Sequence, residues 1–70
     1  MRYTVKAQAF DRHTGLPIGI KRSDVINTIT NRLFAKADGI VDVKRIFEAY
    51  WNDFNPDSQE VVFVQEVTLT

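Results

Sequence analysis

The sequence has no cysteine and only one histidine, one tryptophan, two prolines and three glycines. Without thiols, the chain can form neither a disulfide framework nor a cysteine-based zinc site. Its longest apolar run, residues 61–64, is far shorter than the roughly 20 residues of a membrane-spanning helix or the ~7 to 15 residues of a signal-peptide core. These absences predict a cytoplasmic protein with no membrane partner.

The 70 residues, of which 44% are apolar, suffice for one small domain, which we expect to span residues 1–70. The apolar share argues against intrinsic disorder. A chain of this length buries only about 60% of the surface that its unfolded form exposes, so self-association would add stability that the core alone lacks. A homodimer or larger homo-oligomer is therefore among the expected states.

Three segments have the patterns of β-strands. They are residues 2–9, 16–21 and 60–70. The first alternates polar and apolar side chains, as a half-buried strand does. In the second, Pro17 and Gly19 suit a sheet edge better than its centre. The third follows an expected turn at residues 55–58 and is rich in β-branched and aromatic residues, which favour strands.

The spacing of apolar residues between the second and third strands predicts a helical hairpin. The first helix would run from Ser23, a suitable N-cap, to Gly39 at the C′ position. The second would run from Asp42 to Phe54 along one apolar stripe, although the β-branched residues at 40–46 also allow a strand. The expected fold is α+β, a two-layer β-β-α-α-β domain with a three-stranded sheet covered on one face by the helical hairpin.

The sequence offers no constellation for catalysis or cofactor binding. His13 is the only imidazole, and it lies with Asp11 in a turn-forming stretch without a nucleophile pattern beside it. There is no glycine-rich phosphate loop, no nucleophile elbow and no His-Glu-x-x-His motif. We therefore expect a protein that is not an enzyme and has no cofactor.

One local string resembles part of a calcium-binding loop. Residues 37–43 place Asp, Gly and aliphatic side chains at the central positions of such a loop. The same alignment places Phe34, Lys36 and Arg45 where oxygen ligands are needed. A hard cation would lack its ligands, so we expect no metal site and interpret Gly39 as the residue that ends the first helix.

The formal net charge of zero hides a division of the chain into two oppositely charged halves. Residues 1–36 carry seven Lys or Arg and two Asp, a net charge of +5, whereas residues 37–70 carry two Lys or Arg and seven Asp or Glu, a net charge of −5. An antiparallel fold could interleave these charges into ordinary surface ion pairs. Alternatively, the halves could meet head to tail between copies in a self-assembling domain.

The basic half also allows an alternative function, that of a nucleic-acid-binding accessory protein. No nucleic-acid module signature is present, and no aromatic platform accompanies the cations, so charge is the only criterion met. The cations that would contact phosphates are Arg2, Lys6, Lys21, Arg22, Arg32 and Lys36.

Apolar residues at the margins of the expected elements favour a protein partner instead. Phe34 and Trp51 lie at helix edges, where aromatic residues either complete the core rim or anchor a partner. Val61, Phe63, Val67 and Leu69 should face the helices, which leaves Val62 and Val64 on the uncovered sheet face.

The sequence thus predicts a non-catalytic protein-interaction module, or a small inhibitor or accessory protein. It would bind another protein with an acidic surface through the open sheet face and the aromatic helix edge. The predicted partner-binding residues are Phe34, Trp51, Val62 and Val64 as apolar anchors, with Lys6, Arg32 and Lys36 as the cations that attract the partner.

Overall fold

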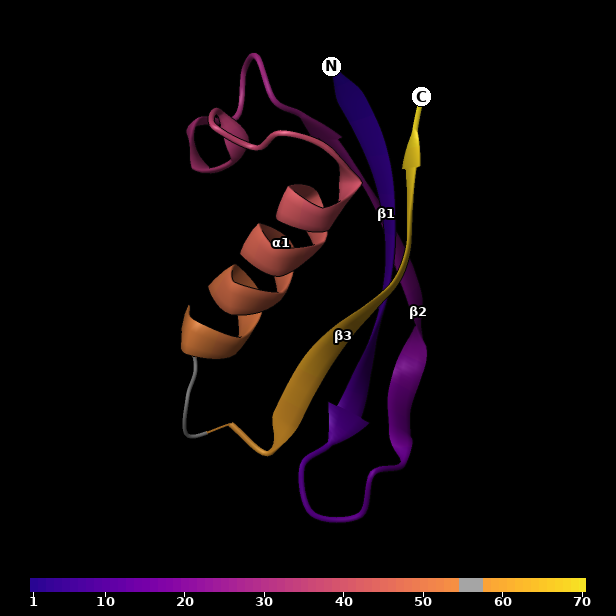
Figure 1. Ribbon diagram of the computed structural model, residues 1–70. Coiled ribbons are helices and arrows are strands. Elements are labelled where there is room, and N and C mark those ends of the chain that lie inside the picture. Colours follow the sequence, from indigo (N-terminus) through magenta and orange to yellow (C-terminus); the bar gives the residue numbers. More distant parts are fainter. Residues whose placement is uncertain (55–57) are drawn as a thin grey trace.

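The computed structural model describes residues 1–54 and 58–70, in which three strands and one α-helix form an α+β domain. The elements are β1 (Arg2–Asp11), β2 (Pro17–Asn27), the 3-10 helix η1 (Arg32–Phe34), α1 (Ile40–Phe54) and β3 (Glu60–Leu69). The strands form one antiparallel sheet in the order β2-β1-β3. The helix lies against one face of this sheet (Figure 1).

The predicted α+β class, with a three-stranded sheet and a helix packed on it, is confirmed, but the first helix of the expected hairpin does not form. Residues 23–27 belong to β2, and Gly39 precedes α1 instead of ending a helix. The segment is rich in β-branched residues such as Val25 and Ile26, which favour strands. As a strand it pairs with β1 from Arg2 onward. The predicted turn at residues 55–58 lies, except for Ser58, outside the described residues.

A β-bulge in β3 reverses the predicted orientation of the side chains at residues 61–64, whereas Val67 and Leu69 lie on the helix side of the sheet as predicted. Lys6 pairs with Glu66, but Ala7 pairs with Val64, so Gln65 is the extra residue on β3. Because an extra residue reverses the alternation of faces between the two parts of the strand that it separates, Val64, which precedes Gln65, faces α1 and is 6% exposed. Val61 and Phe63, predicted to face the helices, lie on the opposite face, and Phe63 is 50% exposed. The expectation that Val62 and Val64 lie on the uncovered face is therefore wrong.

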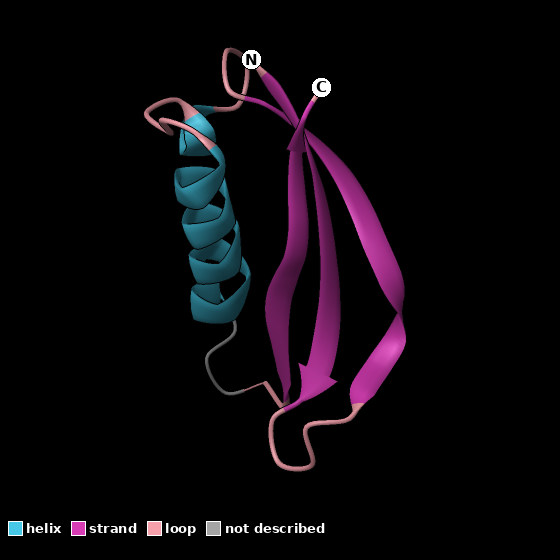
Figure 2. Cartoon of the chain, turned by 45° about the vertical axis from the view of Figure 1, so that its right-hand side comes forward, coloured by secondary structure: helices cyan, strands magenta, loops and turns pink. Residues whose placement is uncertain are grey.

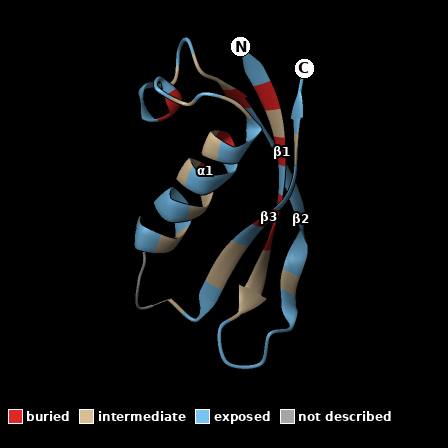
Figure 3. Cartoon of the chain, viewed as in Figure 1, coloured by how far each residue is buried: buried red, intermediate tan, exposed pale blue. Residues whose placement is uncertain are grey.

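The hydrophobic core lies between β1 and α1 (Figure 3). It is built from alternate residues of β1, one face of α1, and single residues of β2, β3 and η1. Its buried members are Tyr3, Val5, Ala7, Ile26, Phe34, Val43, Phe47 and Val64. Among the described residues, no helix has the length and apolar character needed to span a membrane.

A buried glutamine side chain fills an irregularity between β1 and β2. The register shifts between Ala7 and Ala9, where Gly19 has a φ of +68°. The Gln8 Nε2 donates hydrogen bonds to the carbonyl oxygens of Ile18 at 3.0 Å and Gly19 at 3.2 Å. The side-chain amide therefore donates to backbone carbonyls at the point where the ladder is interrupted.

The turn between β1 and β2 is organised by Asp11. Its carboxylate Oδ1 accepts the backbone N–H of His13 at 2.8 Å and of Thr14 at 2.9 Å, as expected for an Asp at the start of a turn. Gly15, with a φ of +74°, completes the turn and donates its N–H to the Asp11 carbonyl.

Protonation of Asp11 should weaken this turn. The N–H groups of Thr14 and His13 bind the charged carboxylate and hold its pKa below the ordinary value of 3.8. The pKa of Asp11 is therefore lower in the folded state than in the unfolded state. The charged carboxylate contributes fully to the stability of the fold above the pKa of the unfolded state, and this contribution is lost as the pH falls through the pKa of the folded state.

We therefore expect Asp11→Ala to lower the Tm at about pH 7 and to have little effect at about pH 2. Thermal unfolding followed by circular dichroism at both pH values measures this difference. Asp53→Ala, which removes an exposed carboxylate of α1, is the matched control. An equal loss of Tm at both pH values would contradict the role of the Asp11 charge.

Candidate functional site

The helix covers one side of the sheet only in part. Its backbone runs closest to that of β3 and farther from that of β1, onto which its buried side chains pack, and β2 lies away from it (Figure 2). The face of β2 that points toward the helix layer is buried at Ile26 but left without a cover before it, and a groove runs between α1 and β2.

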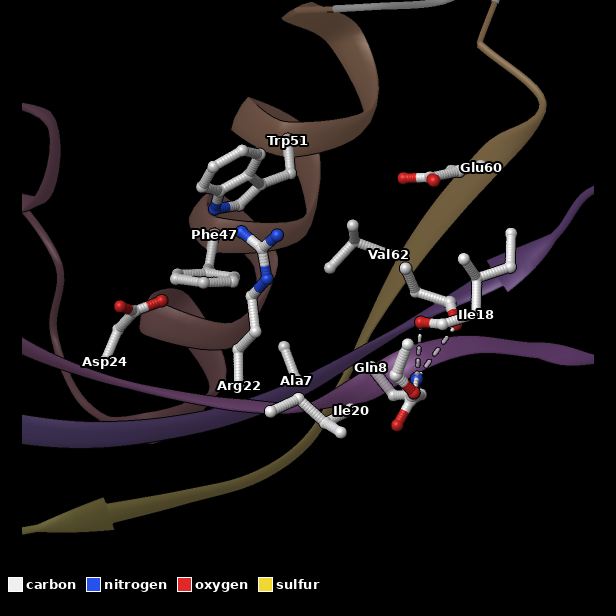
Figure 4. A pocket seen from close by; sticks show the side chains of 12 residues that line it. Ala7, Gln8, Ile18, Ile20, Arg22, Asp24, Phe47, Trp51, Glu60 and Val62 are labelled. Carbon is white, nitrogen blue, oxygen red and sulfur yellow. Dashed lines mark hydrogen bonds between the residues drawn. The ribbon is translucent and has the colours of Figure 1, made fainter.

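This α1–β2 groove consists of two adjoining hollows of about 380 Å³ and 390 Å³, which share Asp24, Phe47 and Trp51. Aliphatic and aromatic side chains dominate its lining, as in most binding sites. Its principal lining side chains are Ile18, Ile20, Arg22, Asp24, Ile26, Leu33, Phe47, Trp51 and Val62. Figure 4 shows Phe47 and Trp51 on the helix side and Arg22 extending from β2.

Three aromatic side chains of α1 form the helix wall of the groove. Phe47 is buried, and its ring centroid lies 6.2 Å from that of Trp51, while Tyr50 meets Trp51 edge to face at 5.8 Å. Trp51 remains 40% exposed, so the prediction that it lies at a helix edge is confirmed. A large, partly exposed indole on a packed aromatic base offers apolar contact area and one N–H donor to a ligand.

Arg22 and Asp24, which carry opposite charges, both line the groove on its β2 side. Arg22 and Asp24 lie on the same face of β2, because they pair with Ala7 and Val5 of β1. Within residues 1–54 and 58–70, ion pairs join Lys6 to Glu66 at 3.7 Å and Arg45 to Asp42 at 3.5 Å. Arg22 and Asp24 take part in neither pair.

The outer edge of β3 is capped by side chains of α1. Asn52 accepts the N–H of Val62 at its Oδ1 (2.8 Å) and donates from its Nδ2 to the Val62 carbonyl (3.1 Å), as a neighbouring strand would. Glu48 accepts the N–H of Val64 at 2.8 Å. Covering an edge with a helix prevents another chain from pairing with it.

The outer edge of β2, in contrast, is open. The Met1 carbonyl accepts the N–H of Thr28, so the odd-numbered residues of β1 direct their backbone groups toward β2. Their partners on β2 in the observed register are the even-numbered residues 22–26. The N–H and C=O groups of Lys21, Ser23 and Val25 therefore point away from the sheet.

The structure separates the residues that the sequence predicts as one partner-binding set. Trp51 lies in the groove, and Val62 contributes to its lining beneath α1. Phe34 and Val64 are 3% and 6% exposed and belong to the core, so neither is available as a surface anchor. Lys6 lies on the opposite sheet face beside Glu66.

The other predicted cations, Arg32 and Lys36, are exposed in the η1 segment, next to the part of the groove lined by Leu33 and Phe34. The open sheet face carries Phe10 and Phe63, whose ring centroids lie 5.8 Å apart, in place of the predicted valines.

The string that resembles a calcium loop forms the start of α1. Asp42 Oδ2 accepts the N–H of Asp38 at 2.8 Å, which lowers the pKa of Asp42 with a smaller contribution from Arg45. An acidic side chain that reaches back to a free N–H is typical of a helix N-terminus. Over the described part of the chain, no group of three or more His, Cys, Asp or Glu residues could hold a metal ion.

Sequence reasoning missed Glu48, Asn52 and Asp24, and it named Arg22 only as a candidate phosphate contact. The spacing of Glu48 and Asn52 could have indicated their shared role. Polar residues that are four apart on a helix lie on the same side of it, and these two lie next to the apolar stripe.

Removing the Asn52 amide should destabilise the fold. Asn52→Ala leaves the N–H and C=O of Val62 without their partners, and we expect a loss of about 1–3 kcal/mol in the free energy of unfolding. Chemical denaturation measures the loss, with the exposed helix variant Lys44→Ala as the control. Equal stability of the two variants would show that water replaces the Asn52 contacts at no cost.

No protein-family model matches the chain, and no curated protein or solved structure is found to be similar to it.

Proposed function

We propose that the chain is a non-catalytic protein-interaction module, acting as an inhibitor or accessory protein, that binds a segment of another protein in the α1–β2 groove. The observation that carries this proposal is the incomplete cover of the sheet by α1. It leaves Trp51 and the helix-side face of β2 exposed to a ligand along the groove. The lining side chains supply apolar contact and charge and no nucleophile paired with a base, so their chemistry supports binding.

The size of the exposed surface supports a partner of this kind. The chain exposes 5120 Å², whereas a folded monomer of 8.1 kDa exposes about 4500 Å². Its radius of gyration of 12.3 Å likewise exceeds the roughly 11 Å expected for this length. Apolar side chains that line the groove are exposed, including Ile20 at 87% and Leu33 at 46%. An apolar surface of this extent is typical of a site that another molecule covers.

The groove indicates the chemistry of the partner segment. An aliphatic or aromatic side chain would pack on Trp51 and Phe47, which form the apolar wall. Arg32 and Lys36 are exposed at the η1 end of the groove and would attract acidic residues that flank this side chain. The proposed ligand is therefore an acidic segment with one large apolar residue.

A nucleic-acid partner has less support, because its candidate cations do not gather on one surface. Arg2, Lys6 and Lys21 lie on the open face of the sheet, and Arg22 lies on the face toward the helix. Lys6 is also paired with Glu66.

Selection from a random peptide library displayed on phage tests the proposal. We expect the enriched peptides to combine a large apolar residue with flanking Asp or Glu. Because Trp51 is the only tryptophan, a synthetic version of an enriched peptide should shift the protein's fluorescence emission to the blue as it covers the indole. Trp51→Ala should weaken peptide binding by about tenfold or more, measured by calorimetry.

Two further variants locate the binding surface. Exchanging Arg32 and Lys36 together for Glu should weaken the binding of acidic peptides, with a smaller dependence on salt than in the unmodified protein. Phe63→Ser, which changes the opposite sheet face, should leave the affinity unchanged. Loss of binding in Phe63→Ser but not in Trp51→Ala would place the site on the open sheet face and overturn the proposal.

A further inference from the structure

We propose that β2 pairs with β2 of a second copy of this chain, so that two molecules share one continuous antiparallel sheet with the strand order β3-β1-β2-β2-β1-β3. The pairing goes beyond the proposed function, because it uses the edge of β2 and needs no ligand in the groove. It rests on three observations: an open strand edge, a self-complementary sequence along that edge, and an excess of exposed surface.

The open edge has the groups that a further strand needs. The N–H and C=O groups of Lys21, Ser23 and Val25 point outward, and an antiparallel strand would accept and donate hydrogen bonds at each of them. The bulge near Gly19 and the ring of Pro17 disrupt the beginning of the edge, so pairing is confined to the part of β2 that follows.

The charges on this edge are self-complementary in one register. When Ser23 lies opposite Ser23 of the second copy, Arg22 lies opposite Asp24 of the second copy, and the same contact occurs again across the two-fold axis. Arg22 and Asp24 direct their backbone groups toward β1 and would form the pairs without hydrogen bonds, in which facing side chains approach most closely. Both ions lack an ion-pair partner in the single chain among the described residues.

The neighbouring registers are disfavoured by the same charges. A shift of the β2–β2 register that keeps outward-pointing residues opposite one another moves the two-fold axis by one residue. An axis at Arg22 brings the two Arg22 guanidinium groups face to face, and an axis at Asp24 brings the two Asp24 carboxylates face to face. Like charges directly opposite one another destabilise strand pairs, and opposite charges stabilise them. The edge therefore specifies both its partner and its alignment.

Apolar residues extend the contact on both sides of the charges. In this register Ile20, which is 87% exposed, lies at the level of Ile26 of the second copy, a residue that is 8% exposed at the rim of that copy's core. On the open sheet face, Val25 lies opposite Lys21 of the second copy, whose aliphatic stem can cover it. Each chain exposes roughly 600 Å² more surface than is expected for its mass, so surface is available for a second copy to cover.

The two-fold axis would place both helices on the same face of the shared sheet. Each α1 lies over β3 and β1, so the two helices would flank a central cleft with the paired β2 strands as its floor. The Arg22 and Asp24 side chains of both copies would lie in that floor, and the two α1–β2 grooves would open into the same cleft.

A charge-exchange experiment tests the pairing directly. Sedimentation equilibrium over a concentration series should show the unmodified chain in a monomer–dimer equilibrium. Arg22→Asp alone and Asp24→Arg alone should each weaken dimerisation by about tenfold or more, because each places like charges opposite one another. An equimolar mixture of the two variants should dimerise again, since every facing pair is then opposite in charge, and the double variant R22D/D24R should dimerise by itself.

Ser23→Pro provides a variant that blocks the edge without changing charge. The N–H of Ser23 points outward, so a proline should leave the β1–β2 ladder intact and abolish the dimer. Circular dichroism confirms that each variant remains folded, and Lys44→Ala is the control that keeps the dimer.

An unmodified chain that remains monomeric up to about 1 mM would overturn the proposal. A dimer that persists in Ser23→Pro, or whose single-charge variants do not recover on mixing, would overturn it as well. The proposed peptide binding is measured separately by Trp51 fluorescence, so the failure of one proposal is distinguishable from failure of the other.

Discussion

The hydrogen bonds from α1 to the backbone of β3 determine the arrangement of this domain. Asn52 replaces a neighbouring strand at Val62, and Glu48 does so at Val64. Because these side chains reach over the outer edge of β3, the helix axis is drawn toward that strand and away from β2. A single helix of 15 residues cannot cover three strands from that position. The groove and the open β2 edge are both consequences of this shift.

The α1–β2 groove and the open edge of β2 differ in physical character, and binding at one does not require the other to be vacant. The groove offers an apolar wall at Trp51 that stays in contact with water until a ligand covers it. Its contribution to binding affinity therefore depends on the apolar area that the ligand buries. The β2 edge offers directional backbone groups and two charges, which select an alignment more than they supply affinity. A chain with a small core can use both, since neither requires the core residues around Val5 and Val43 to move.

The sequence predicts the first and third strands, the helix before β3 and the Asp11 turn, because each has one dominant local pattern. It finds the beginning of β2 but ends this strand at residue 21 instead of Asn27, because the spacing of Val25, Ile26 and Ile29 also fits a helix and only pairing with β1 decides between the two. It also misassigns the faces of β3. An uninterrupted apolar run carries no information about which side is buried, and the bulge at Gln65 follows from the register with β1. Phe34 is likewise placed in the core by tertiary packing, whereas the exposed position of Trp51 follows from its place on the stripe.

The hydrogen bonds of Gln8 to the irregular part of β2 have a consequence for how far strand addition can proceed. Open-ended growth of a sheet into a fibre requires two free edges of useful length on every molecule. Here the bulge that Gln8 fills shortens the free edge of β2, and α1 blocks the first half of the β3 edge, at Val62 and Val64. A molecule that paired once through β2 would therefore have no equivalent edge left, so the proposed contact between two chains would also terminate assembly.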